Sequence, residues 1–420
     1  MLLITNNCLS QTAESSPYSR YGIGNLQSTG FNINNAIGGL AYGINESSNI
    51  NFANPASYGF FKERSFTFET GIENTALTLS TTDTSQTNYN TSMGFLAFGF
   101  PVPKWWGSSF GIRPFTKAAY TTGETVNSTN TGSVNYTYEG AGGINQFYWG
   151  NGFQFNGLAI GINTSYLFGP LEKNRRQIFD QTNTLNYYNN ELINLGGFYF
   201  NYGMQYSHTM DSLFKKQLSK PITLTLGGVV DFNTSLKARK KEIGITFIEY
   251  IEDPFLILPL DTVLSTHDTN SIVFPKSIGV GITLKRGNQL LIGLDYEQRI
   301  WSEYLSFGEK DPSITDSKRY AFGIQYTPNS KANNYLATVH YRAGLNYQNS
   351  NLIINGLQLD QYGTTFGVGL PLKRLKSVLH LSVEWGERGT TEKGLLKESY
   401  WKTRFGITLN DLWFVKRKYD

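Results

Sequence analysis

Side chains that could carry out catalysis or bind a metal ion are few and widely separated. The 420 residues include four histidines and one cysteine, Cys8, so a disulfide framework and a thiolate metal site are both excluded. His340 and His380 stand in no recognisable relation to a serine and an acid, as a hydrolase triad requires. The chain has no Gly-x-x-x-x-Gly-Lys-Ser/Thr phosphate-binding loop. We therefore expect no enzymatic activity and no cofactor.

Charged residues are the other candidates, although they make up only 16 % of the chain. The formal net charge of +4 is too small to indicate a nucleic-acid partner. Several charged side chains fall on the polar side of segments in which polar and apolar residues alternate. They line a polar passage, hold an N-terminal segment through Arg20, or pair with each other across a wall, which is the usual arrangement of such groups. These residues are Asp231, Asp295, Glu297, Arg342, Glu384 and Arg404.

The composition indicates an all-β membrane protein. Aromatic residues make up 15 % of the chain, and there are 43 glycines. The apolar stretches, such as Phe255 to Leu258, are far shorter than the ~20 residues that cross a bilayer as a helix. A bundle of transmembrane helices is therefore excluded, and a β-barrel is the class that remains.

Strict alternation of apolar and polar residues begins at Ser65. Tyr320, Phe322, Ile324 and Tyr326 share one side of a segment whose other side is small and polar. This period of two is typical of a strand with one apolar face. Because the polar face is rich in glycine and poor in charge, it suits a lumen, and the apolar face suits contact with lipid.

About fourteen such segments follow one another, and the connections between them are alternately short and long. Outer-membrane barrels have short periplasmic turns and long external loops, so the pattern predicts a transmembrane antiparallel barrel in a Gram-negative-type outer membrane, in contact with its lipid. Among the predicted long loops are Thr81 to Tyr89, Gly123 to Ser133, Gly169 to Glu191 and Lys237 to Ser271. The predicted strands are Ser65–Ser80, Asn90–Pro101, Trp105–Thr122, Val134–Phe155, Leu158–Phe168, Leu192–His208, Ile222–Leu236, Ile272–Lys285, Gln289–Tyr304, Arg319–Thr327, Tyr335–Gln348, Leu357–Leu370, Ser377–Glu387 and Ser399–Trp413.

Tryptophan positions give the strands a membrane depth. Trp401 and Trp413 bracket the apolar row of the last predicted strand, and twelve steps at ~3.3 Å with a tilt of ~45° span ~28 Å, close to the apolar band of such barrels. We interpret the tryptophans at strand ends as aromatic girdles at the membrane interfaces. The others at strand ends are Trp105, Trp106, Trp301 and Trp385, whereas Trp149 lies mid-strand.

The N-terminal part of the chain does not alternate. Residues 1–11 are interpreted as the remnant of a signal peptide, with cleavage near Ser10 or Gln11. Residues 12–62 are rich in small residues and turn formers, which allows a chain to pack compactly inside a polar tube. We predict that residues 12–62 form a hatch in the lumen of a barrel built from residues 63–420.

Two short motifs in this segment carry a family resemblance: Gly38-Gly39 and Asn54-Pro55-Ala56. Together with the architecture they resemble the FadL/TodX-type outer-membrane transporters of hydrophobic compounds. A second match is Gly142-Gly143-Ile144-Asn145-Gln146. The resemblance implies a fourteen-stranded barrel plugged by its hatch, with hydrophobic ligands captured outside and released sideways through a gap made by an inward kink of the third strand.

Two features of the sequence fit such a ligand route. Pro114, in Arg113-Pro114-Phe115, lies inside the predicted third strand and cannot donate to a ladder, so it marks either a lateral opening or a closed bulge. Phe255, Leu256, Ile257 and Leu258 form an exposed apolar run in the longest predicted loop. They provide a capture groove for an apolar ligand or pack on neighbouring loops.

Two functions fit this architecture. The first is passive, hatch-gated passage of hydrophobic small molecules such as long-chain fatty acids or aromatic hydrocarbons. The alternative is a non-transporting accessory barrel of a protein secretion complex (type IX) or a surface assembly complex, with a protein of that complex as its partner. The first predicts an apolar pocket between hatch and wall, and the second predicts a filled lumen.

Overall fold

The computed structural model describes residues 16–128, 132–181, 184–210, 221–250, 253–372 and 377–412. Within these ranges, nothing is described for the side chains of residues 128, 249, 250, 253–257 and 412. The predicted signal-peptide remnant, residues 1–11, and Trp413 lie outside the described residues.

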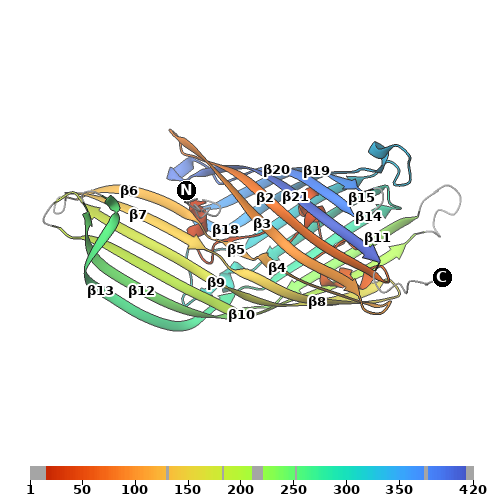
Figure 1. Cartoon of the computed structure of the whole chain (residues 1–420), viewed down its shortest axis with the longest axis horizontal. Helices are drawn as coiled ribbons and strands as arrows, with labels where there is room; N and C mark the ends of the chain where they lie inside the picture. The colour runs from red at the N-terminus through yellow and green to blue at the C-terminus, as the bar shows by residue number, and fades with distance from the viewer. Residues whose placement is uncertain are drawn as a thin grey trace, which may run out of the picture.

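Fourteen antiparallel strands close into a barrel, as the sequence predicted (Figure 1). Four of them are interrupted and carry two labels each: β4 (Trp106–Pro114) with β6 (Tyr120–Ser128), β7 (Gly132–Gly142) with β8 (Asn145–Phe155), β11 (Ile222–Asp231) with β12 (Thr234–Tyr250), and β13 (Asp253–Phe274) with β14 (Ser277–Arg286). The others are β2 (Ser65–Ser80), β3 (Ser85–Pro101), β9 (Leu158–Phe179), β10 (Asn186–Thr209), β15 (Leu290–Arg299), β17 (Ser317–Tyr326), β18 (His340–Ile354), β19 (Leu357–Pro371), β20 (Val378–Arg388) and β21 (Lys397–Leu412).

Short elements lie between and inside these strands. Two ladders have only two paired positions each. In the first, β1 (Asn25–Leu26) pairs with β5 (Thr116–Lys117), and in the second, β16 (Leu305–Ser306) pairs with β13. The remaining elements are η1 (Pro17–Arg20), α1 (Asn32–Ala36), η2 (Pro55–Phe60), η3 (Trp301–Glu303), η4 (Tyr335–Thr338) and η5 (Glu392–Gly394). None of the helices among the described residues is long and apolar enough to cross a membrane.

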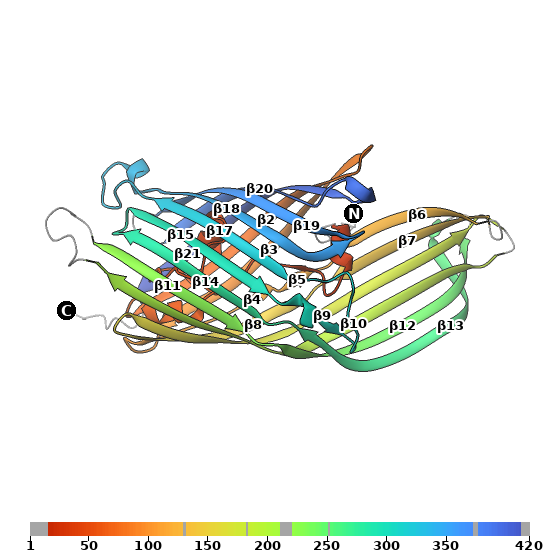
Figure 2. The ribbon, with the colours of Figure 1, turned by 180° about the vertical axis from the view of Figure 1, so that it is seen from behind.

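The prediction of long loops was wrong in one respect, because most of the residues assigned to these loops lie in strands. The predicted loop Gly169 to Glu191 is the outer part of β9 and β10, and Lys237 to Ser271 is the outer part of β12 and β13. With β6 and β7, these strands form a curved six-stranded sheet, here called the outer lobe, that projects far beyond one end of the barrel (Figures 1 and 2). The alternation of apolar and polar residues stops before these strands end. The outer lobe projects beyond the lipid-facing part of the barrel, so neither of its faces has to be apolar.

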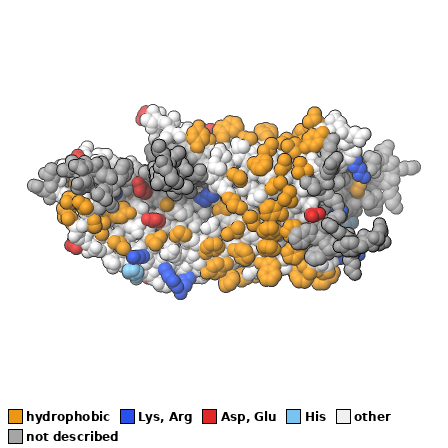
Figure 3. Space-filling view, in the orientation of Figure 1, with side chains coloured by type: hydrophobic (Ala, Val, Ile, Leu, Met, Phe, Trp, Pro, Cys, Tyr) orange, Lys and Arg blue, Asp and Glu red, His pale blue; other side chains and the backbone are white. Residues whose placement is uncertain are grey.

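The outer surface of the barrel carries a wide apolar band. Hydrophobic side chains gather over β3, β4, β8 and β9 and thin out over the outer lobe (Figure 3). On the opposite wall, residues in register on five neighbouring strands form a continuous exposed apolar row: Leu226, Ile282, Leu294, Phe322 and Leu345. The alternating segments therefore face lipid with their apolar side, as predicted.

An aromatic girdle marks the outer edge of this band. Tyr296, Tyr320, Tyr347 and Tyr362 are direct partners on successive strands, and Trp385 pairs with Trp401. Trp105, Trp385 and Trp401 are exposed, which agrees with their predicted place at the interfaces, and so is the mid-strand Trp149. The interpretation of Trp301 was wrong: it is 3 % exposed, because the chain leaves the wall after Arg299 and enters η3, where the strand parity no longer applies.

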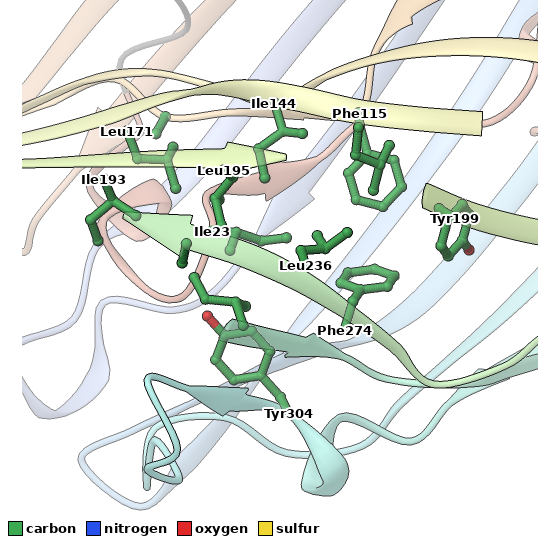
Figure 4. Packing of buried hydrophobic residues seen from close by; sticks show 14 of the residues in the cluster. Ile23, Phe115, Ile144, Leu171, Ile193, Leu195, Tyr199, Leu236, Phe274 and Tyr304 are labelled. Carbon is green, nitrogen blue, oxygen red and sulfur yellow. The ribbon is translucent and has the colours of Figure 1, made fainter. Parts of the chain in front are cut away.

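The outer half of the lumen is closed by a hydrophobic core. Inward-facing residues of β9, β10, β12 and β13 meet Phe115, Trp301 and Tyr304 around Ile23 of the N-terminal segment (Figure 4). This core lies at the junction between barrel and outer lobe. A soluble protein packs its interior in the same way, and Ile23 makes the N-terminal segment part of this core.

Substitution by a charged residue tests how deep a lipid-facing position lies in the membrane. We predict that Leu294→Arg lowers the free energy of unfolding by about 2–4 kcal/mol, because the guanidinium would lie near the middle of the apolar band. Urea titration in lipid vesicles would measure this loss. The control is Val263→Arg, since Val263 and Leu294 are both 55 % exposed but Val263 belongs to the outer lobe. Equal losses in the two variants would contradict the assigned depth.

Candidate functional site

The first hatch motif, Gly38-Gly39, lies against the barrel wall. Both glycines have left-handed backbone, with φ of +71° and +78°, which other residues rarely adopt. Their carbonyls accept hydrogen bonds from Arg319 Nη2 at 3.1 and 3.0 Å, and the Gly38 N–H donates to Thr365 Oγ1 at 2.8 Å. A Cβ on Gly38 would lie 2.7 Å from the Leu345 carbonyl oxygen. The motif thus allows backbone to touch backbone.

The second motif, Asn54-Pro55-Ala56, begins η2. Asn54 caps it by accepting from the Ala56 N–H, while its Nδ2 donates to the Tyr42 carbonyl at 2.8 Å and to the Met204 carbonyl of β10 at 3.3 Å. Pro55 occupies the first turn, where its missing N–H costs nothing. The motif therefore links the hatch to itself and to the wall.

The wall meets η2 with a row of glycines that the sequence analysis did not single out. Gly107, Gly152, Gly161 and Gly203 are direct partners on four neighbouring strands. A Cβ on any of them would collide with residues 54–58 of the hatch. A second row, Gly293, Gly323 and Gly344, lies under Ile37 to Leu40 in the same way. The hatch is therefore seated directly on bare wall backbone.

Wall carboxylates bind the hatch backbone as well. Asp295 Oδ2 accepts from the N–H groups of Ala41 and Tyr42 at 2.6 and 2.9 Å. Glu69 Oε1 accepts from the Ile50 N–H at 2.9 Å. Both side chains are buried, so these bonds satisfy hatch N–H groups in a space with little water.

Four of the other predicted inner-face charges, Asp231, Glu297, Glu384 and Arg404, lie in ion pairs of the wall, whereas Arg342 contacts Gln325 and His380. Arg404 contacts Glu73 at 2.5 Å and Glu384 at 2.7 Å. Arg299 lies 3.2 Å from Glu297 and 3.6 Å from Asp231. These pairs match the expected wall-to-wall arrangement. Arg20, by contrast, is exposed and lies 4.9 Å from the ring of Tyr21, so the carboxylates hold the hatch through its backbone and not through Arg20.

The histidines are held by their neighbours. His340 Nδ1 lies 2.7 Å from Thr327 Oγ1, and His380 bonds Arg342 and Thr408. Among the residues that the structure describes, no group of three His, Cys, Asp or Glu side chains is close enough to hold a metal ion.

Tyr18 fixes the outer end of the hatch. Its hydroxyl donates to the Leu396 carbonyl at 2.6 Å, and the Arg388 guanidinium lies 4.8 Å from its ring centre. Burial raises the pKa of Tyr18 to about 12, so the hydroxyl stays protonated and continues to donate at any physiological pH.

A cavity of about 230 Å³ remains between hatch and wall. Its lining is rich in charge and includes Arg113, Arg319 and Lys402 beside the two ion-pair clusters. Its apolar lining residues are Leu26, Phe52, Ala53, Phe115, Tyr199 and Trp301. The space is suited to water and ions more than to a hydrocarbon.

The ladder of the wall is interrupted beside Pro114. The ladder between β3 and β4 ends at Leu96–Ile112, whereas β4 stays paired with β8 as far as Pro114–Asn145. The chain then turns inward, and β5 pairs with β1 of the hatch. Further along, β6 pairs with β7 alone. No described strand therefore pairs with the outer part of β3, from Ser85 to Phe95, on its side toward β6.

The residues around Pro114 anchor this inward turn. Arg113 is buried and donates to Gln146 Oε1 and to the carbonyls of Gln27 and Ser28. Phe115 packs on Tyr199 and Phe274 in the core (Figure 4). Outside the turn lies an open, mostly apolar cavity of about 430 Å³ lined by Met93, Phe95, Ile112, Pro114, Gly143 and Pro170 among others.

The apolar run Phe255 to Leu258 is not in a loop. Its backbone belongs to β13 at the far end of the outer lobe, and Leu258 is 41 % exposed. The side chains of Phe255, Leu256 and Ile257 lie outside what the structure describes.

Comparison with known proteins decides the family. A family model described as BamG matches residues 1–420. The chain belongs to the BamG family. No curated protein sequence matches it.

Solved structures show that this BamG-family barrel has the fold of hydrophobic-compound channels. The toluene transporter TodX of Pseudomonas putida is 15 % identical, with a TM-score of 0.58 over 92 % of this chain and 99 % of its own. The toluene transporter TbuX of Ralstonia pickettii is 14 % identical, with a TM-score of 0.56 over 91 % and 99 %. A Pseudomonas aeruginosa FadL homologue is 11 % identical, with a TM-score of 0.57 over 92 % and 99 %. The barrel is an outer-membrane protein by this fold.

Adjacent glycines on β11 test the contact between hatch and wall. A Cβ on Gly227 would collide with the Tyr42 carbonyl of the hatch, whereas one on Gly228 would have 4.0 Å to its nearest neighbour. We predict that Gly227→Ala lowers the free energy of unfolding by about 1–3 kcal/mol through overpacking, while Gly228→Ala changes it by less than about 0.5 kcal/mol. Thermal unfolding in detergent would compare them, and equal effects would refute direct seating.

Asp295 tests the polar anchor. We predict that Asp295→Leu leaves the Ala41 and Tyr42 N–H groups buried without an acceptor, at about 1–3 kcal/mol for each group. The loosened hatch should then be cleaved faster by trypsin at Arg20 and Lys62, which are already exposed in the native chain. Asp295→Asn is the control, since its amide oxygen still accepts a hydrogen bond. If cleavage in the leucine variant matches the asparagine variant, the anchor contributes nothing.

Proposed function

We propose that this BamG-family barrel is a non-transporting component of an outer-membrane assembly complex. The observation that carries the proposal is the close contact between hatch and wall. Two rows of wall glycines, the side chains of Asp295 and Glu69, and the hydrophobic core around Ile23 all contact the hatch. A hatch so held leaves a filled lumen, which is what an accessory barrel requires and a passage does not. The family name BamG points in the same direction, and it favours assembly of outer-membrane proteins over a type IX secretion role.

Polarity of the remaining space supports the same proposal. Passage of a hydrocarbon would need an apolar path between hatch and wall, and the space of about 230 Å³ is instead bordered by Arg113, Glu297, Arg299, Glu384 and Arg404. Moving an apolar molecule past these ion pairs would separate charges that are buried and paired, which is costly.

Passage of hydrophobic small molecules is the second candidate. The opening beside Pro114 and its apolar cavity of about 430 Å³ favour it, as does the fold that the chain shares with the toluene transporters. In this function the opening would be the exit, and the hatch would have to move to admit the ligand.

A disulfide that locks the hatch separates the two functions. Leu26 of β1 and Thr116 of β5 are direct partners, so a double cysteine variant in a Cys8→Ser background has the Cα spacing that a disulfide needs. In a strain that lacks the native chain, we predict that the oxidised lock restores normal levels of outer-membrane barrel proteins, measured by quantitative mass spectrometry. The two single-cysteine variants control for the substitutions.

Uptake of labelled toluene and oleic acid is measured in the same strains. The proposal predicts that the strain without the chain has lower levels of barrel proteins than the locked and unlocked strains. All three strains should take up the labelled compounds equally. Normal barrel proteins together with uptake that the lock abolishes would overturn assembly in favour of transport.

A further inference from the structure

The outer part of β3 is an unpaired sheet edge. β3 is paired with β2 along its length, but on its other side only Leu96 to Pro101 find partners, on β4. From Ser85 to Phe95 the backbone groups on that side meet no described strand. An edge of this kind is a template for pairing with another chain.

The aromatic girdle shows that part of this edge lies inside the membrane. Trp401 pairs with Ala76, and Ala76 pairs with Tyr89 of β3, which is 76 % exposed. Tyr89 is thus two ladder steps from Trp401 of the outer girdle. Below it, Met93 pairs with Ile72, and both side chains are exposed to the apolar band.

Hydrocarbon does not tolerate such an edge. Unpaired N–H and C=O groups each cost several kcal/mol where no water is present, so open sheet edges are absent from lipid-exposed membrane surfaces. Elsewhere the described part of this barrel obeys that rule through continuous ladders. The segment from Thr91 to Phe95 is the exception, and it requires a partner that supplies backbone donors and acceptors.

The neighbouring cavity has room for apolar side chains of such a partner. The space of about 430 Å³ borders Met93 and Phe95 on β3 and Ile112 and Pro114 across the gap, and Pro114 cannot itself donate a hydrogen bond. On the lumen side, Lys117 Nζ donates to Ser92 Oγ at 2.7 Å. This contact uses a side chain, and it leaves the backbone edge of β3 facing the cavity.

We propose that the β3 edge from Ser85 to Phe95 binds a transmembrane β-strand of another outer-membrane barrel by β-augmentation. A strand supplies at once the backbone hydrogen bonds that the edge lacks and the apolar side chains that the cavity accepts. An acyl chain or a hydrocarbon fills only the cavity and leaves the edge unpaired. The inference rests on the proposed assembly function for the identity of its occupant.

Register-dependent crosslinking tests this pairing in the full chain. The protein is reconstituted in nanodiscs as a Cys8→Ser variant with one cysteine at Thr91 or Met93. The probe is a synthetic peptide with the sequence of β21, Lys397–Leu412, which stands in for a transmembrane strand and carries a single cysteine moved along its length. Ile72→Cys is the control, because Ile72 lies at the same depth as Met93 on a strand that is paired on both sides.

A paired strand gives a distinctive pattern. Directly opposite residues on paired strands are close enough for a disulfide, and side chains alternate between faces, so we expect crosslinking to alternate along the peptide. Its maximum should shift by two peptide residues when the protein cysteine moves from Thr91 to Met93. The yield at Ile72 should be several-fold lower.

Two results would overturn the inference. One is crosslinking that has no preferred register or is equally strong at Ile72, which indicates partition into lipid. The other is absence of crosslinking at Thr91 and Met93 while oleic acid or toluene protects Met93→Cys from a maleimide, which indicates an apolar ligand site. Since the assay contains no cells, either result leaves the test of the assembly function unaffected.

Discussion

Direct contact between hatch backbone and wall backbone is the constraint on which the rest of this structure depends. A β-barrel of fourteen strands is too wide for its own inward side chains to fill, so the lumen must hold either water or a plug. Here glycines in register on neighbouring strands remove the side chains from the wall at the places where Ile37 to Ala41 and Asn54 to Tyr58 rest. The freed backbone space is occupied by the hatch, and Asp295, Glu69 and Arg319 satisfy the polar groups that this close approach buries.

Much of the barrel was predictable because lipid imposes a simple pattern on each strand. The alternation around Tyr320 to Tyr326 and the exposed Trp385 and Trp401 both follow from an apolar outer face. The outer lobe was missed because β9, β10, β12 and β13 leave the lipid and lose the pattern without ending as strands. Gly38-Gly39 and Asn54-Pro55-Ala56 were found as motifs, but their wall partners were not, since register between strands far apart in sequence is not visible in one chain. The prediction for Trp301 failed for a different reason: its burial depends on a local inward turn of the chain after Arg299.

A hatch held tightly against the wall and an interrupted ladder beside β3 occur together in this chain. The toluene transporters share its architecture, and the inward turn at Pro114 leaves a gap beside β3 in this chain. Yet the interior that a ligand would cross is closed by the core around Ile23 and bordered by ion pairs. The groups that remain free to bind a partner are therefore the unpaired backbone N–H and C=O groups of β3 in the wall. A protein strand can form hydrogen bonds with such groups, whereas a small apolar molecule cannot.

Amide hydrogen exchange of the full chain in nanodiscs tests the central claim most directly. If the hatch is seated as a fixed part of the wall, the amides from Ile37 to Tyr42 and from Asn54 to Tyr58 should exchange as slowly as those of the barrel strands. Fast exchange in these two segments, with the strands still protected, would mean that the hatch opens readily, and the account of a permanently filled lumen would be wrong.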